Sequence, residues 1–145
     1  MKEYLNYLKT LDINERSPIF KRLSLLYNIG KRICPDKISD IFISEYMNAG
    51  GSRQYVSFWL FSENYVLESP QFLKETNMDI IPIKNAVNYC QFNLKDYELV
   101  KSTKDSRFTL LAYFAENAFG EFKASGENCN KLLLIFEKYF KGNME

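Results

Sequence analysis

The chain has 145 residues, of which 46% are hydrophobic and 16% aromatic, so it is long enough to bury the core of one domain. Nineteen Lys and Arg residues are balanced by eighteen Asp and Glu residues, which leaves a formal net charge of +1 at pH 7. This balance argues against a nucleic-acid partner, because proteins that bind the phosphate backbone carry a strongly basic surface. We therefore predict a single domain over residues 1–145 that does not bind nucleic acid.

The absence of histidine from the sequence excludes several kinds of site. Imidazole is the commonest transition-metal ligand and the one side chain that titrates near neutrality without tuning by its surroundings. Ser-His-Asp and Cys-His catalysis are therefore excluded, as are zinc sites that contain histidine. The three cysteines, Cys34, Cys90 and Cys129, lie tens of residues apart and form no C-x-x-C pair. We predict no metal, no cofactor and no catalytic residue, which favours a protein that is not an enzyme.

Two features of the sequence bear on its location. There is no run of about 18 apolar residues, and the first ten residues, MKEYLNYLKT, lack the unbroken apolar stretch of a signal peptide. A small, odd number of cysteines is typical of a reducing compartment. We predict a soluble, cytoplasmic protein.

The first 35 residues are predicted to form a helical N-terminal extension. Tyr4, Leu5, Leu8 and Leu11 recur at helical spacing. Ser17-Pro18 is typical of a helix start, with a hydroxyl cap followed by proline in the first turn. The apolar stripe of this second helix runs through residues 19–29 and stops before Pro35, whereas Gly30 either ends the helix or is tolerated within it.

From residue 38 the apolar period changes to two, which predicts antiparallel strands joined by tight turns. Glycine-containing residues 48–52 and residues 115–118 are predicted hairpin connections, and Pro82 confines its strand to a sheet edge or a strand end. Seven or eight strands are expected, near residues 41–46, 53–61, 65–68, 79–83, 86–92, 97–100, 108–114 and 119–123.

The chain ends in a predicted amphipathic helix. Its apolar residues fall at i, i+3, i+4, i+7 and i+11, and they are Cys129, Leu132, Leu133, Phe136 and Phe140. Ser125 is the expected cap and Gly142 the expected end. One face of this helix should pack against the sheet.

This order of strands followed by a C-terminal helix resembles the pleckstrin-homology-like barrel, in particular its small bacterial versions, over residues 38–141. The resemblance implies a bent sheet closed into a barrel, one open end of which the helix caps. Members that bind phosphoinositides carry several basic residues around the first hairpin, whereas residues 47–55 here offer only Arg53. The same order of elements also resembles the helix-grip cup of lipid-transfer proteins, which needs an N-terminal strand in place of a helix at residues 4–8. In both cases the fold class is α+β.

Two groups of residues are candidate binding elements. Lys21, Arg22, Lys31, Arg32 and Arg53 are possible contacts to an anionic surface, or else ordinary solvated charges. At about 1 kcal/mol per basic residue, four of them contribute at most about 4 kcal/mol, too little for stable membrane attachment. Six tyrosines lie in predicted strands and can leave hydroxyls at a surface or a pocket rim: Tyr46, Tyr55, Tyr65, Tyr89, Tyr97 and Tyr113.

Together these features favour a non-catalytic module that binds a protein or peptide through a barrel edge strand or through the groove beside the C-terminal helix. One alternative is a helix-grip protein, a small-molecule carrier or enzyme with an aromatic-lined cavity. The other is weak peripheral binding to an anionic membrane through the basic N-terminal helices. Nothing in the sequence points to an oligomeric state.

Overall fold

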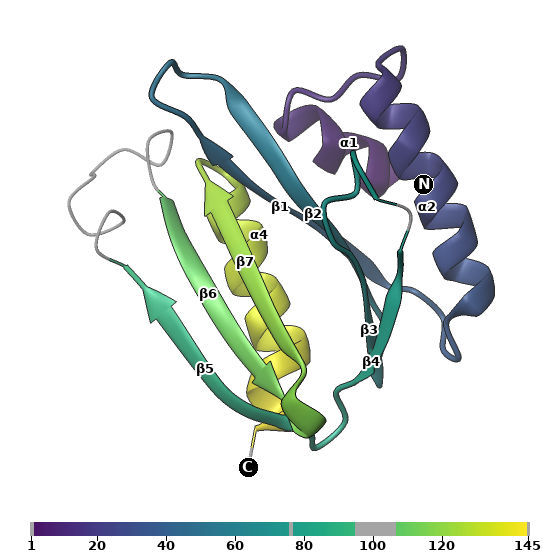
Figure 1. The fold of residues 1–145 in the computed structure, drawn as a ribbon, viewed down its shortest axis with the longest axis vertical. Helices are drawn as coiled ribbons and strands as arrows, with labels where there is room; N and C mark the ends of the chain where they lie inside the picture. Colours follow the sequence, from purple (N-terminus) through teal and green to yellow (C-terminus); the bar gives the residue numbers. More distant parts are fainter. Residues whose placement is uncertain (1, 76, 95–106, 145) are drawn as a thin grey trace.

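The computed structural model describes residues 2–75, 77–94 and 107–144 of an α+β protein (Figure 1). Three α-helices are described: α1 (Lys2–Thr10), α2 (Pro18–Ile33) and α4 (Asn128–Ile135). Seven strands are described: β1 (Asp40–Met47), β2 (Arg53–Phe61), β3 (Tyr65–Ser69), β4 (Asp79–Pro82), β5 (Val87–Asn93), β6 (Arg107–Phe114) and β7 (Phe119–Ser125). The strand predicted at residues 97–100 lies outside the described residues.

The strands form two antiparallel sheets, with the orders β1-β2-β3-β4 and β5-β6-β7. In the described part of the chain the sheets are not closed into a barrel, which corrects the expectation of one continuous bent sheet. Where β1 lies next to β7, side chains take the place of backbone pairing: the amides of Lys123 and Ser125 donate to Ser44 Oγ (2.8 Å) and Glu45 Oε2 (2.7 Å). A β-bulge between Ser44 and Glu45 interrupts the regular register of β1 at this corner.

The two N-terminal helices form as predicted. Ser17 caps α2, because its hydroxyl accepts a hydrogen bond from the amide of Phe20 (3.1 Å). Gly30 lies inside α2, which continues to Ile33. A Cβ atom at Gly30 would lie 2.0 Å from Cδ1 of Leu60 on β2, so the missing side chain lets the helix approach the sheet closely.

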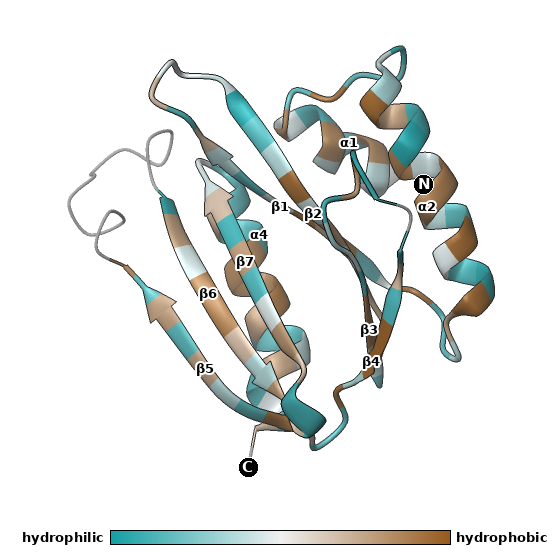
Figure 2. Cartoon of the chain, in the orientation of Figure 1, coloured by the Kyte–Doolittle hydropathy of each residue, from teal (hydrophilic) through white to brown (hydrophobic). Residues whose placement is uncertain are grey.

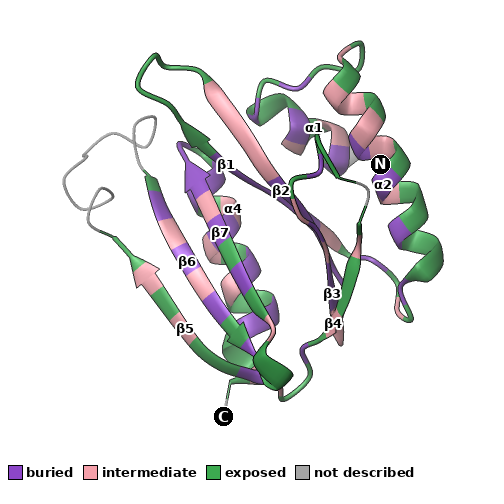
Figure 3. Ribbon diagram, viewed as in Figure 1, coloured by how far each residue is buried: buried purple, intermediate pink, exposed green. Residues whose placement is uncertain are grey.

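In the four-stranded sheet most of β1 and β3 and the second half of β2 are buried, whereas the edge strand β4 is mostly exposed (Figure 3; the hydropathy of the same strands is shown in Figure 2). Along β2, Phe58 and Leu60 pack with α1 and α2, whereas Trp59 and Phe61 pack with the second sheet and α4. All four side chains are fully buried. This half of the strand is therefore covered on both faces, and the N-terminal helices supply one of the two covers.

The turns and the edge proline also follow the sequence predictions. Asn48 Oδ1 accepts from the amides of Gly50 (3.0 Å) and Ser52 (2.9 Å), and Gly51 adopts a positive φ of 82° in the turn between β1 and β2. A short turn, Ala115–Asn117, joins β6 to β7. Pro82 ends β4, which is an edge strand.

The C-terminal helix forms, but its ends differ from the prediction. Ser125 does not cap it, because this residue ends β7 and donates its hydroxyl to Glu45, while α4 begins at Asn128. Irregular helical turns continue from Phe136 to Asn143, so Gly142 does not end them. Among the residues on the predicted apolar face, Cys129, Leu132 and Phe140 are buried and Leu133 and Phe136 are half-buried.

Asp40 at the start of β1 anchors the far end of this helix. Its carboxylate accepts from Lys138 Nζ (2.7 Å) and from the Tyr139 hydroxyl, and it forms an ion pair with Lys131 (3.3 Å). Burial alone would raise the pKa of Asp40, but these donors hold it below its ordinary value. The helix is therefore fixed to the first sheet by both polar and apolar contacts.

Replacing Gly120 should test how tightly the two sheets pack. In Gly120→Ala the new Cβ would lie 2.9 Å from ring atoms of both Trp59 and Phe122, which are rigid and fully buried. Overpacking of this kind should lower the free energy of unfolding by about 1–3 kcal/mol in urea denaturation. Gly142→Ala is the matched control, because no heavy atom lies within 4 Å of its Cβ position. Equal stability of the two variants would contradict the packing described.

Candidate functional site

The structure does not bring the five predicted basic residues together. The Arg22 guanidinium donates to the backbone carbonyls of Phe72 (2.8 Å) and Glu75 (2.7 Å), so it ties α2 to the segment after β3. Lys21 and Arg32 are exposed on α2, about three turns apart, and Lys31 lies over the ring of Tyr27 at 4.8 Å. Arg53 is engaged in ion pairs, described next.

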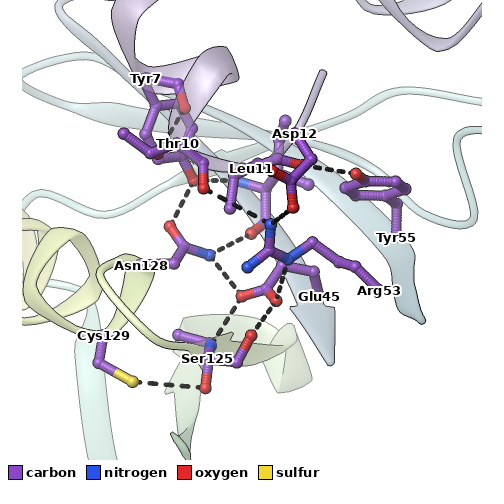
Figure 4. Close-up of polar contacts among 12 residues, drawn as sticks. Tyr7, Thr10, Leu11, Asp12, Glu45, Arg53, Tyr55, Ser125, Asn128 and Cys129 are labelled. Carbon is purple, nitrogen blue, oxygen red and sulfur yellow. Dashed lines mark hydrogen bonds and ion pairs between the residues drawn. The ribbon is translucent and has the colours of Figure 1, made fainter. Parts of the chain in front are cut away.

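A buried carboxylate, Glu45 on β1, lies at the corner between the two sheets (Figure 4). Its oxygens accept from the amide of Ser125 (2.7 Å), from the Ser125 hydroxyl, from Asn128 Nδ2 (2.8 Å) and from Arg53 Nε (3.1 Å). Glu45 is fully buried, and the Arg53 side chain is only 12% exposed. The negative charge is thus matched by one cation and three further hydrogen-bond donors.

Further hydrogen bonds connect this carboxylate to the N-terminal helices. Asn128 Oδ1 accepts from the hydroxyl of Tyr7 on α1 (2.7 Å), and that hydroxyl accepts from the amide of Ile43 (2.9 Å). Arg53 Nη1 pairs with Asp12 (2.8 Å), just beyond α1. We call Tyr7, Glu45, Arg53, Ser125 and Asn128 the corner cluster. Because its polar atoms bond to one another and burial raises the pKa of Tyr7, its chemistry is that of a structural junction and not of an acid–base site.

A second region of interest lies along β5, an edge strand of the three-stranded sheet. At its first residue, Val87, this strand also forms an isolated parallel bridge to Met144. Towards α4, four apolar side chains are half-buried and line the boundary between strand and helix; this β5–α4 seam consists of Cys90, Phe92, Leu133 and Phe136. The rings of Phe92 and Phe136 meet edge to face, with centroids 5.1 Å apart.

Exposed aromatic rings lie on the opposite face of the same sheet. Tyr89, Tyr113 and Phe119 are cross-strand neighbours, with ring centroids 5.7 and 5.0 Å apart, and each is more than 40% exposed. This agrees with the prediction that some strand tyrosines reach the surface. Tyr46 is exposed as well, whereas Tyr97 lies outside the described residues.

The space between the sheets and α4 is filled by aromatic side chains. Phe122 packs against Trp59 (ring centroids 4.2 Å apart), Phe61 (6.3 Å) and Phe140 (5.4 Å). One hollow among the described residues, about 610 Å³ in volume, opens to solvent beside the start of β2.

The remaining candidate groups offer no reactive arrangement. Burial raises the pKa of the Cys90 thiol to about 11 and that of Cys129 to about 12, so both are protonated at neutral pH. The acidic residues Glu116 and Glu121 are exposed in and beside the last hairpin. Among the residues that the structure describes, no three His, Cys, Asp or Glu side chains could hold a metal ion, and no helix could cross a membrane.

Sequence reasoning missed the corner cluster. Glu45 reads as one more member of an alternating strand, and Ser125 reads as a helix cap. One signal was present: the hairpin turn at residues 48–52 places Glu45 diagonally across from Arg53, an opposite charge on the neighbouring strand. The contacts with Ser125 and Asn128 span 80 and 83 residues and leave no local signature.

Comparisons of the chain with models of protein families, with curated proteins and with solved structures found no match. The functional interpretation therefore depends on the geometry of the site. Two surfaces stand out in that geometry: the β5–α4 seam, and the hollow beside β2.

Removing the Glu45 carboxylate should be strongly destabilising. Glu45→Ala removes the acceptor of Arg53 Nε and of the Ser125 amide and hydroxyl, and one of the two acceptors of Asn128 Nδ2. We expect the free energy of unfolding to fall by about 3–5 kcal/mol in urea denaturation, the usual cost of breaking a buried ion pair. Glu63→Ala, at an exposed turn position, should change it by less than about 0.5 kcal/mol. A small effect of Glu45→Ala would mean that the cluster does not hold the sheets together.

A second acidic residue, Glu68 on β3, lies directly across from Asp79 on β4. Burial, with a further contribution from the negative charge of Asp79, raises the pKa of Glu68 to about 7. The folded protein thus binds this proton more tightly than the unfolded chain does. The free energy of unfolding contributed by Glu68 should therefore fall as the pH rises from about 4.5 to about 7, and stay constant above that range.

Glu68→Gln should remove this pH dependence, since glutamine carries no titrating proton. The thermal midpoint of the variant minus that of the wild type, measured at each pH, should therefore increase as the pH rises from about 5 to about 8. Glu63→Gln, in the same hairpin and exposed, serves as the control and should keep the wild-type profile. A parallel pH profile for wild type and Glu68→Gln would show that Glu68 titrates normally in the folded protein.

Proposed function

We propose that the protein is a non-catalytic interaction module that binds an extended peptide segment as an added strand along β5. The observation that carries this proposal is an edge strand whose inward-facing residues, Cys90 and Phe92, remain half-exposed beside Phe136 of the C-terminal segment. A sheet edge offers backbone donors and acceptors to an incoming strand. The β5–α4 seam then offers apolar contacts to every second side chain of that strand.

The fold supports this interpretation. A four-stranded sheet, a three-stranded sheet and a C-terminal helix packed between them follow the order implied by the pleckstrin-homology-like resemblance, and we retain that family as a proposal. In the described part of the chain β4 and β5 belong to different sheets, so β5 lies at the edge of the three-stranded sheet.

The alternatives are less well supported. Residues 4–8 form part of α1 and not the strand that a helix-grip cup requires, and aromatic rings fill the space that a cavity would occupy. For membrane binding, Arg22 and Arg53 are engaged in contacts within the protein, which leaves Lys21, Lys31 and Arg32. Three residues at about 1 kcal/mol each give about 3 kcal/mol, less than stable attachment needs.

The proposed setting is a reducing compartment such as the cytoplasm. All three cysteines are free, and two of them are buried. The near-neutral net charge continues to argue against a nucleic-acid partner.

Selection of peptides from a random library displayed on phage, with the full-length protein as bait, tests the proposal. Enriched peptides should alternate apolar and polar residues, as an added strand requires. Their dissociation constants, measured by fluorescence polarisation, should rise about tenfold or more in Phe92→Lys, because this change places a charge in the seam. Leu134→Lys is the matched control: Leu134 is 61% exposed on α4 and lies outside the seam, so its affinity should match the wild type.

A spin-labelled copy of an enriched peptide gives a second measurement that does not depend on a variant. Amide signals of β5 and of residues 133–136 should broaden. Those of β4, an edge strand of the four-stranded sheet, should stay sharp. Failure to enrich any peptide, or broadening centred away from β5, would overturn the proposal.

A further inference from the structure

The hollow beside the start of β2 has the size of a small-molecule site. Its volume is about 610 Å³, within the roughly 300–1,000 Å³ typical of ligand pockets. Its lining residues come from β1, β2 and β7, from the first turn of α2 and from the segment after β3. Five apolar side chains contribute to its lining, among them Tyr46, Tyr55 and Leu73. Tyr46 and Leu73 are more than 40% exposed, so apolar surface is available there.

The residues that line this hollow carry positive charges but no negative ones. Its ten lining residues include Arg53, Lys74 and Lys123 but no Asp or Glu. The charge of Arg53 is offset by Glu45 and Asp12, so Lys74 and Lys123 are the lining cations that can attract an anion.

Two of the three cations are available to a ligand. The Arg53 guanidinium is held by Glu45 and Asp12 (Figure 4), so it is a fixed group in the lining of the hollow. Lys74 is exposed. Lys123 lies over the ring of Tyr46 at 5.2 Å, and its ion pair with Glu121 is long, 3.8 Å, with both side chains more than a third exposed. A pair of this kind contributes little and gives way readily to a competing anion.

We propose that this hollow, the Lys74–Lys123 groove, binds a small amphiphile that has a carboxylate head and an apolar body. The carboxylate is held by the ammonium groups of Lys74 and Lys123. The apolar body lies against Tyr46, Tyr55 and Leu73. This site is separate from the β5–α4 seam, because β7, which carries Lys123, is the other edge strand of the three-stranded sheet from β5.

Calorimetric titration with three ligands that share one alkyl chain tests the proposal on the intact protein: decanoate, decan-1-ol and decyltrimethylammonium, all below their micellar concentrations. Decanoate should bind saturably with a stoichiometry of one. The neutral and cationic ligands should bind about tenfold or more weakly, because they lose the charge-assisted contacts. Equal affinity for the anion and the cation, or no saturable binding of decanoate, would overturn the proposal.

A charge-reversed pair of variants locates the site. Lys74→Glu combined with Lys123→Glu should weaken decanoate about tenfold or more. Lys84→Glu combined with Lys141→Glu changes the net charge equally at exposed positions that do not line the groove, and it should leave the affinity within about twofold. If the double variant of the groove fails to fold, Lys74→Gln alone, a change at an exposed position, is tested in its place. It should also weaken the binding of decanoate. Unchanged affinity in the groove variants would exclude this groove as the site.

Discussion

The fold depends on the need to bury both faces of one sheet. In β2, Phe58 and Leu60 point to one side and Trp59 and Phe61 to the other, and none of the four is exposed. Burying a large apolar side chain contributes about 1.5–3 kcal/mol, so leaving either face in water would sacrifice much of the net stability of a domain this size. The second sheet and α4 cover one face. Helices α1 and α2 cover the other, and their apolar side chains share one core cluster with β1, β2 and β3.

Those layers have to be held in one relative position, and apolar packing alone allows sliding. The corner cluster supplies directional contacts at the point where the layers meet, since its members come from α1, β1, β2, β7 and the start of α4. Burying a carboxylate costs several kcal/mol unless it is fully hydrogen-bonded. The Glu45 carboxylate is fully hydrogen-bonded, because four donors reach its oxygens. These donors come together only when the five elements are arranged as they are here. Beside Glu45 the register of β1 and β2 shifts by one residue, and Ser44 and Glu45 join β1 to β7 through their side chains.

The sequence predicts those features that depend on neighbouring residues. Ser17 is identified as a cap because its partner, the amide of Phe20, is three positions away, and the turn at residues 48–52 is recognised from its own asparagine and glycines. Ser125 is misassigned because its actual partner, Glu45, lies 80 residues away. For the same reason Arg22 and Arg53 look like free surface cations in the sequence, although carbonyls and carboxylates from distant segments hold them. The division into two sheets depends on one bulge and on a corner joined by side chains, neither of which has a sequence signature.

The uneven cover of the two sheets determines where the protein can meet other molecules. Helices and strands enclose the four-stranded sheet, whereas in the described part of the chain the three-stranded sheet is covered on one face and keeps β5 as an edge. The two proposed sites lie on opposite edges of this second sheet, with β6 between them. Coupling between two sites requires an element that changes state when either is occupied. The strands between these sites are clamped by the aromatic packing around Phe122 and by the corner cluster, so an extended segment at β5 and an amphiphile beside β7 would bind to a common rigid frame and act independently.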